Sequence, residues 1–582
     1  MTKCVVLGWS CNFPGATDSH AFWELLRRGE IAIGDIPRGR WGEDRESIQH
    51  LTKETTTKAG YLQHTDAFDE QAFHLSRSEA VHMDPNQRLA LQGVHEALLH
   101  AGIPPDSIRG SDTSVFAGAG TAEHMAMNFA DPANMTMHTM SGNSLSVIAN
   151  RVSFHYDLHG MSACIDTACS SALSALSLAA DSITSGRSRF AIVIGVNTLL
   201  GPSPFVGFGR AGMLSPTGES RPFDQDGRGF VRGEGCGVVI LCRHDQIPTW
   251  CSSRADLVAY GCNEDGHTNS LTMPSASAQQ RMLTDVMQRA GVQPNEICYF
   301  EAHGTGTPTG DPIEAASISA SIARHRTNGP LLIGSVKGNI GHLETASGIA
   351  SFIKCLLMLQ EGQTVPTAGF ATWNATIDPI ASNLCIEASG SRTLPPHAVL
   401  GVNNYGFGGS NACCFVRGVV SPILPSRLLP AVAAVSCHYV EGIDPLFDQL
   451  VADSSVRQHA TSVSLAMPQM KFRKFQIDRT PPVTCREGDE RLAQNNILLV
   501  LPGQGAAYSD MAVTLGRDVP FFGDRLQELI IHFRDLGGLD LHAIGLGRTP
   551  LADTVLRDGG YMTAITVLFQ VALTELILHL GI

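Results

Sequence analysis

Short apolar runs with strand character alternate with longer helical stretches over residues 1 to about 420. The runs at 190–196 and 236–241 have the apolar composition of buried strands, and the stretches at 85–101 and 347–360 have helical character. This order predicts β-sheets covered by helices, which is an α/β fold. The 582 residues suit two to four domains, so this region accounts for only part of the chain.

Two strand–turn–helix units in this region have the same design. The first combines an apolar run at 161–165, a turn that holds Cys169 and a helical run of small residues at 172–180. The second combines a strand-like run at 331–333, a turn that holds His342 and a helix of small and apolar residues. This likeness suggests a duplicated architecture with an active element in each half.

Cys169 is the candidate nucleophile. Most of the 15 cysteines in such a chain would be inert and buried. Cys169 differs because a strand-to-helix turn sits at the positive end of the helix dipole, which favours a thiolate over a thiol. The small residues that follow it let the helix pack closely and leave the sulfur approachable.

Two histidines beside glycines supply the partners that a thiolate needs. His303 precedes a glycine and threonine loop at 304–307, and His342 follows Gly341. A lone histidine is usually structural, and a glycine loop can bind phosphate, but this loop lacks the Lys-Ser/Thr ending of a phosphate-binding loop.

Together these three residues suit thioester chemistry. The thiolate of Cys169 can take an acyl group from a thioester, and two neutral imidazoles can donate hydrogen bonds to a second thioester carbonyl. Those bonds would stabilise the enolate formed when a malonyl unit loses carbon dioxide. Neither step requires a metal or a redox cofactor, so we expect none in this chain.

Charge and composition exclude several other classes. The net charge of −14 without a dense basic stripe argues against nucleic-acid binding. The cysteines form no CxxC pairs and no zinc-type clusters, which predicts reduced thiols in the cytoplasm and no metal site. The apolar stretch at 564–582 is interrupted by Gln570, Glu575 and His579, so we expect a core helix there and no membrane span.

Residues 1 to about 420 resemble the β-ketoacyl synthase domain of a type I polyketide synthase. The match follows the whole region in order, and its segments around Cys169, His303 and His342 are highly specific. Animal-type fatty acid synthases share these three segments. The matching segments lie at 13–15, 22–26, 83–88, 166–172, 221–224, 229–235, 301–307, 310–314, 335–344 and 403–410.

The resemblance implies roles for the three central residues. Cys169 would accept the acyl chain, and His303 and His342 would bind the extender carbonyl and assist its decarboxylation. Cysteine rather than glutamine at position 169 argues against a domain that only decarboxylates. The Cys-His-His set also differs from the Cys-His-Asn set of chalcone-synthase-like enzymes and the Cys-His-Cys set of thiolases.

The resemblance also implies supporting groups. Lys337 and Glu314 would form a charge pair that Asp311 could join, with a solvated Lys337 as the alternative. The backbone N–H groups of Cys169 and Phe407 would form an oxyanion hole. The turn at 406–409, which includes Phe407 and Gly408, would gate the acyl pocket, with a plain glycine-rich turn as the alternative.

The implied fold is the thiolase fold, with two duplicated halves in five layers, α-β-α-β-α. Members of this family dimerise through the domain, so we expect a homodimer. The extender and the growing chain would arrive on the phosphopantetheine arm of an external acyl carrier protein, because no carrier domain is visible in the sequence.

The remaining chain has a different amino-acid composition. Prolines gather early in 421–495 and glycine thins out, which predicts a linker or small α/β adaptor domain. Leu501-Pro502-Gly503-Gln504-Gly505 resembles the opening of a malonyl/acyl transferase domain, but no GxSxG follows residue 496. We therefore expect 496–582 to be the truncated and inactive N-terminal part of such a domain.

Two other functions stay open at this point. The chain could be a fatty-acid-type elongating synthase, which chain-length and extender preference would reveal. It could also be a catalytically silent dimerisation scaffold of a megasynthase, although the presence of Cys169, His303, His342 and Lys337 argues against silence.

Overall fold

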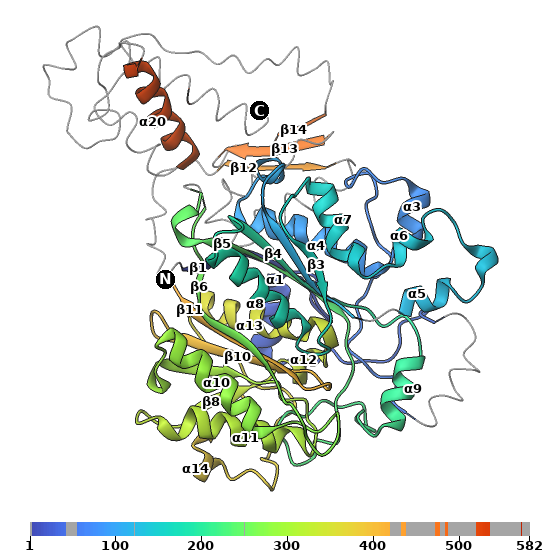
Figure 1. The fold of residues 1–582 in the computed structure, drawn as a ribbon, viewed down its shortest axis with the longest axis vertical. Helices are drawn as coiled ribbons and strands as arrows, with labels where there is room; N and C mark the ends of the chain where they lie inside the picture. The colour runs from blue at the N-terminus through green and yellow to red at the C-terminus, as the bar shows by residue number, and fades with distance from the viewer. Residues whose placement is uncertain are drawn as a thin grey trace, which may run out of the picture. The chain divides into compact units, whose positions relative to one another are not determined.

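The computed structural model describes residues 3–41, 55–120, 123–248, 251–419, 432–437, 472–477, 483–486, 520–535 and residue 572 (Figure 1). The chain forms two compact units. The first comprises residues 1–98, 108–246 and 253–420, and the second comprises 99–107, 247–252 and 421–582. The predicted catalytic residues all belong to the first unit.

An 11-stranded sheet forms the framework of the first unit, in the order β3-β2-β4-β5-β1-β6-β11-β10-β7-β8-β9. Several of its strands are buried along their whole length or all but one residue of it, which explains their continuous apolar runs. The strands are β1 (Cys4–Asn12), β2 (Ser114–Gly118), β3 (Ser162–Ile165), β4 (Phe190–Asn197), β5 (Gly235–Arg243), β6 (Ala255–Glu264), β7 (Ile297–Glu301), β8 (Leu331–Gly334), β9 (Leu384–Cys385), β10 (Val399–Tyr405) and β11 (Ser410–Gly418).

The sheet consists of two halves with the same topology. From the junction outward, the first half runs β1-β5-β4-β2-β3 and the second runs β6-β11-β10-β7-β8. In each half the first two pairings are antiparallel and the next two are parallel. The halves join where residues 4–6 of β1 pair antiparallel with residues 255–257 of β6. The predicted duplication is therefore confirmed.

Helices α8 (Ser171–Thr184) and α13 (Ser347–Glu361) form the central layer. They follow the equivalent strands β3 and β8, and both contact strands of the two halves. Residues 347–358 of α13 are all buried, as expected of a helix with neighbours on every side. The two helices approach closely, because a Cβ on Gly348 would lie 2.7 Å from Leu173 Cγ.

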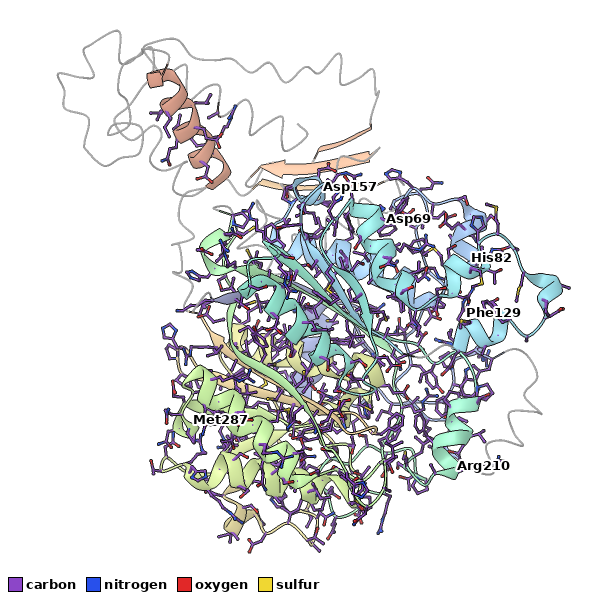
Figure 2. The ribbon with its side chains drawn as sticks, in the orientation of Figure 1. Asp69, His82, Phe129, Asp157, Arg210 and Met287 are labelled. Carbon is purple, nitrogen blue, oxygen red and sulfur yellow. The ribbon has the colours of Figure 1, made fainter. Side chains whose placement is uncertain are left out.

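Outer helices cover the two faces away from this central layer (Figure 1). Helices α4 (Pro85–Ala101) and α7 (Ser146–Tyr156) lie on the first half, and α10 (Ala276–Ala290) and α11 (Gly310–Ser321) lie on the second. This is the predicted five-layer thiolase-like arrangement, and side chains fill the space between the layers (Figure 2). Shorter helices are α1 (Ser19–Arg28), α3 (Arg77–His82), α5 (Glu123–Asn128), α6 (Thr139–Asn143), α9 (Ser203–Arg210), α12 (Lys337–Ile340) and α14 (Pro379–Ser382).

The second unit is described only in part. Strands β12 (Val432–Cys437), β13 (Phe472–Ile477) and β14 (Val483–Arg486) form an antiparallel sheet inside the predicted linker region. Of the predicted transferase fragment, helix α20 (Pro520–Asp535) and residue 572 are described, while the turn at 502–506 lies outside the described residues. In the described parts of the chain, no helix has the length and apolarity needed to cross a membrane.

A substitution at Gly118, at the end of β2, tests the close packing beside the turn that holds Cys169. A Cβ at this position would lie 2.5 Å from the backbone nitrogen of Ala172 in the first turn of α8. Because backbone cannot move aside cheaply, we expect Gly118→Ala to destabilise the first unit by about 1–3 kcal/mol. Thermal unfolding of the full chain measures this. Gly34→Ala, which has open space at its Cβ, is the matched control. Equal midpoints for the two variants would contradict the prediction.

Candidate active site

Cys169 lies in a tight turn between β3 and α8. Ala168, just before it, adopts a left-handed conformation with φ of 55°. The side chain of Ser171 accepts a hydrogen bond from Thr167 N–H at 2.9 Å and donates one to the carbonyl of Ala168 at 2.6 Å. These bonds fix the turn, and the half-buried Cys169 lines a cavity of about 640 Å³.

His303 and His342 line the same cavity as Cys169. His303 follows β7, and His342 follows α12. The centroids of the two rings are 5.3 Å apart, with their planes nearly perpendicular. The structure therefore brings together the three residues that the sequence analysis proposed, from three separate elements of the fold.

The hydrogen bonds of each ring define where its proton sits. The amide of Asn404 donates to Nδ1 of His303 at 3.1 Å, and the backbone N–H of Glu344 donates to Nδ1 of His342 at 3.0 Å. The backbone donor fixes the proton of His342 on Nε2, and the orientation of the Asn404 amide assigns the same tautomer to His303. Burial, together with the charge of Lys337, lowers the pKa of both histidines well below the ordinary range, so both are neutral donors.

Glu314 and Asp311 organise the loop that carries His303. Glu314 accepts the backbone N–H groups of His303 and Gly304, both at 2.7 Å. Asp311 accepts those of Phe223 at 2.6 Å and Gly306 at 3.2 Å. Burial raises the pKa of Glu314 to about 7 and that of Asp311 to about 6, and these hydrogen bonds oppose both shifts.

Lys337 differs from its predicted arrangement. Its Nζ is buried and has no hydrogen-bond partner among the described residues, so it does not pair directly with Glu314. The expected charge pair acts only through space, because the Glu314 oxygens are committed to backbone N–H groups. Burial lowers the pKa of Lys337 to about 8, and the charges of Glu301 and Glu314 oppose this shift.

Phe407 and its glycine turn reach the Cys169 sulfur. The backbone N–H groups of Phe407 and Cys169 both face Sγ and favour its thiolate form. A Cβ on Gly406 would lie 2.4 Å from the carbonyl oxygen of Thr167, so only glycine permits this approach. Phe407 lines the cavity and is half exposed, whereas Gly408 does not line it.

The surroundings of Cys169 oppose the thiolate that its strand-to-helix turn was expected to favour. Burial raises the pKa of Cys169 to about 12, and the charge of Glu344 acts in the same direction. Lys337 and the two backbone N–H groups oppose this shift without overcoming it. The resting form at neutral pH is therefore the thiol.

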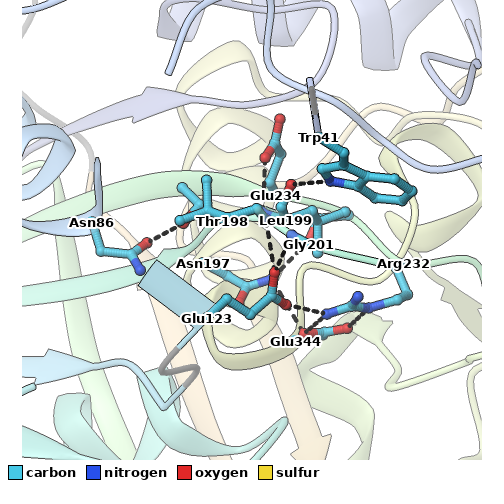
Figure 3. Close-up of polar contacts among 12 residues, drawn as sticks. Trp41, Asn86, Glu123, Asn197, Thr198, Leu199, Gly201, Arg232, Glu234 and Glu344 are labelled. Atoms are coloured by element: carbon cyan, nitrogen blue, oxygen red, sulfur yellow. Dashed lines mark hydrogen bonds and ion pairs between the residues drawn. The ribbon is translucent and has the colours of Figure 1, made fainter. Parts of the chain in front are cut away.

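A network of buried charges beside His342 was not singled out from the sequence (Figure 3). Arg232 binds Glu344 through two nitrogens, at 2.5 and 3.0 Å, and reaches Glu123 at 3.3 Å. Arg232 and Glu344 both line the cavity. The available signal was charge within otherwise glycine-rich and apolar segments, at Gly229-Phe230-Val231-Arg232-Gly233-Glu234 and at Gly341-His342-Leu343-Glu344. Asn404 was missed as well, although its segment was noted.

Family comparisons agree with this geometry. Residues 1–246 match the model of the β-ketoacyl synthase N-terminal domain, and residues 254–371 match that of the C-terminal domain. The chain is similar to a phenolphthiocerol/phthiocerol polyketide synthase subunit of Mycobacterium tuberculosis, with 36% identity over 99% of this chain and 32% of the relative. Another subunit of the same bacterial synthase is 38% identical over 93% of this chain and 37% of its own length. The chain thus spans about a third of the length of these relatives.

Solved structures give the same picture. An oxazolomycin ketosynthase domain from Streptomyces albus has a TM-score of 0.76 at 28% identity, covering 82% of this chain and 86% of that one. The ketosynthase from module 6 of the bacillaene synthase of Bacillus subtilis has a TM-score of 0.73 at 28% identity, covering 94% of each chain. The chain belongs to the β-ketoacyl synthase family and carries a ketosynthase domain of the polyketide synthase type.

Proposed function

We propose that this chain catalyses the decarboxylative Claisen condensation that elongates a polyketide. Cys169 would hold the acyl chain, and His303 and His342 would bind the malonyl-type extender. The observation that carries this proposal is the convergence of one thiol and two neutral Nε2–H donors on a single cavity.

The first step would be transfer of the acyl group to Cys169. The sulfur attacks the thioester carbonyl of the incoming chain, and the N–H groups of Cys169 and Phe407 receive the negative charge that develops on the oxygen. The histidines are poor bases here, because Nδ1 of each is already occupied as an acceptor. The thiol proton of Cys169 would therefore pass to the departing pantetheine sulfur, which leaves as a thiol.

The second step would form the new carbon–carbon bond. The extender loses carbon dioxide, and its electrons move to an enolate whose oxygen accepts hydrogen bonds from Nε2–H of His303 and His342. The enolate carbon then attacks the acyl carbon on Cys169, and the sulfur leaves as a thiolate that takes a proton from water. The buried cation of Lys337 would stabilise negative charge in both steps.

The cavity wall suits an aliphatic acyl chain. Much of its lining is apolar, with aromatic side chains of Phe208, Phe230 and Phe407 and the methionines Met213 and Met273. Phe208 and Phe407 pack edge to face, with ring centroids 6.1 Å apart. Because Phe407 also supplies an oxyanion N–H group, movement of its turn would couple admission of the chain to assembly of the oxyanion hole.

Two partners follow from this proposal. An acyl carrier protein would deliver both thioesters on phosphopantetheine, and a second copy of the chain would cover the edge of β3, the end strand of the described sheet. Two exposed apolar side chains lie on the segments next to this edge: Phe154 on α7, which contacts β3, and Met161, which directly precedes β3. We also place the reaction in the cytoplasm, because all 13 cysteines with described side chains are free thiols.

Self-acylation tests the nucleophile. Incubation of the full chain with a short acyl-pantetheine thioester should give an adduct at Cys169, mapped by mass spectrometry. The adduct should be absent in Cys169→Ala and retained in Cys262→Ala, which removes an exposed thiol that does not line the cavity. A folded protein without an adduct at several acyl lengths would indicate a silent scaffold.

Histidine variants separate the two steps. His303→Ala and His342→Ala should each lower condensation with a malonyl thioester by about 10²- to 10³-fold, the usual cost of losing one oxyanion donor. Acylation of Cys169 should be retained in both, because its oxyanion donors are backbone groups. Equal losses in acylation and condensation would contradict these assignments.

A substitution beside the edge of β3 tests whether the chain forms a homodimer through this edge. Phe154 is 84% exposed on α7, and Phe154→Glu should convert a dimer into a monomer because it would place a charge in the interface. Light scattering on the full chain reports the mass. Ile380→Glu is the matched control, since Ile380 is 90% exposed on α14 in the second half and should leave the mass unchanged. A monomeric parent chain, or a dimer that survives Phe154→Glu, would rule out this surface.

A further inference from the structure

The side chain of Arg232 is buried at the wall of the cavity. Its Nε and Nη2 bind the two oxygens of Glu344 at 2.5 and 3.0 Å, in a fork that fixes the carboxylate in both position and plane. Nη2 also contacts Glu123 at 3.3 Å, and the guanidinium carbon lies 4.5 Å from the ring centroid of Phe205. Arg232 is therefore held rigidly from several sides.

Glu123 anchors this network to the main chain. Its second oxygen accepts the backbone N–H groups of Leu200 and Gly201, both at 2.7 Å (Figure 3). Asn197 adds a contact to Glu344 at 3.4 Å and binds the carbonyl of Gly233 at 2.9 Å. The charges thus tie the segment that follows β4 to the turn that contains His342.

Glu344 is connected directly to His342. It has a left-handed backbone with φ of 49°, an unfavourable conformation for a residue with a side chain. In this conformation its N–H donates to Nδ1 of His342. The backbone of His342 is fixed on the other side, because its N–H donates to the carbonyl of Val231, next to Arg232.

The same charges face both reactive groups. Arg232 and Lys337 are the cations that act on His342, and each favours the neutral imidazole. Glu344 and Lys337 are the charged groups that act on Cys169, where Glu344 opposes ionisation of the thiol and Lys337 favours it. An unpaired Glu344 would therefore make His342 easier to protonate and Cys169 harder to ionise.

We propose that Arg232 is a positioning residue, which through its ion pair with Glu344 keeps His342 a neutral Nε2–H donor and shields Cys169 from the Glu344 charge. This inference rests on the proposed function for its catalytic meaning. The fork fixes the plane of the Glu344 carboxylate, which a single-point contact would not do. Arg232 touches no reacting atom in this scheme.

The first experiment does not require condensation. The rate of Cys169 alkylation by iodoacetamide is measured from pH 7 to 9 in the full chain. Arg232→Met should lower the rate at pH 8 by about tenfold, the effect of one pKa unit, because Glu344 is left unpaired. Arg232→Met with Glu344→Gln should restore it. Glu344→Gln alone should raise the rate and also serves if Arg232→Met does not fold.

A neighbouring ion pair is the matched control. Arg40 binds Glu234 in a buried contact at 2.9 Å, and this pair contacts neither His342 nor Glu344. Arg40→Met should leave the alkylation profile unchanged, with folding checked by circular dichroism. An equal decrease in Arg40→Met and Arg232→Met, or no change in Arg232→Met and Glu344→Gln, would overturn the proposal.

The second experiment uses the pH profile of condensation. In the parent chain the rate should stay level between pH 6 and 7, because His342 is neutral throughout. In Arg232→Met the rate should fall as the pH is lowered from 7 to 6, because loss of the Arg232 charge makes His342 easier to protonate and protonation removes its acceptor nitrogen. Arg232→Lys, which keeps the charge without the fork, should restore the level profile at a lower maximum.

The proposed function and the positioning role of Arg232 can be refuted separately. A parent chain that neither acylates Cys169 nor condenses would refute the proposed function, while the alkylation series would still test the electrostatic role of Arg232. If the parent chain condenses and the condensation rate of Arg232→Met is as level between pH 6 and 7 as that of the parent, the positioning role alone would be refuted.

Discussion

The close contact of α8 and α13 between the two halves of the sheet is the constraint on which the site depends. Gly348 of α13 makes it possible by packing against Leu173 of α8, and Gly118 at the end of β2 lets the backbone of α8 approach the sheet at Ala172. Because each helix follows the equivalent strand of its half, the turn before α8 and the turn before α13 open onto one cavity. Duplication thus places Cys169 and His342 together, although they lie far apart in sequence.

Backbone groups, more than charged side chains, define the chemistry of this cavity. Cys169 and Phe407 offer N–H groups to the sulfur, the Glu344 N–H holds His342, and backbone N–H groups occupy Glu314 and Asp311. Such donors are fixed by the fold and need no reorganisation during reaction. Burial then keeps both imidazoles neutral, so they serve as hydrogen-bond donors to a developing negative charge.

Burial also changes what the charged residues can do. A helix terminus favours a thiolate, but desolvation raises the pKa of Cys169 and so favours the thiol. Lys337 remains a buried cation without a hydrogen-bond partner among the described residues, poised to respond to negative charge formed nearby. Arg232 stands at the opposite extreme, with an ion pair that holds the Glu344 charge in place.

The sequence by itself determined the α/β class and the duplicated design, and it singled out Cys169, His303 and His342 as candidate catalytic residues. Periodicity, turn composition and residue type are local properties, and they can be recognised without knowledge of tertiary contacts. Only the tertiary structure decided that Lys337 and Glu314 do not touch, that Asn404 and Glu344 fix the imidazole protons, and that Arg232 holds Glu344. The contacts of Asn404 with His303 and of Arg232 with Glu344 join residues about 100 positions apart, and the state of Lys337 depends on burial; no local pattern encodes either.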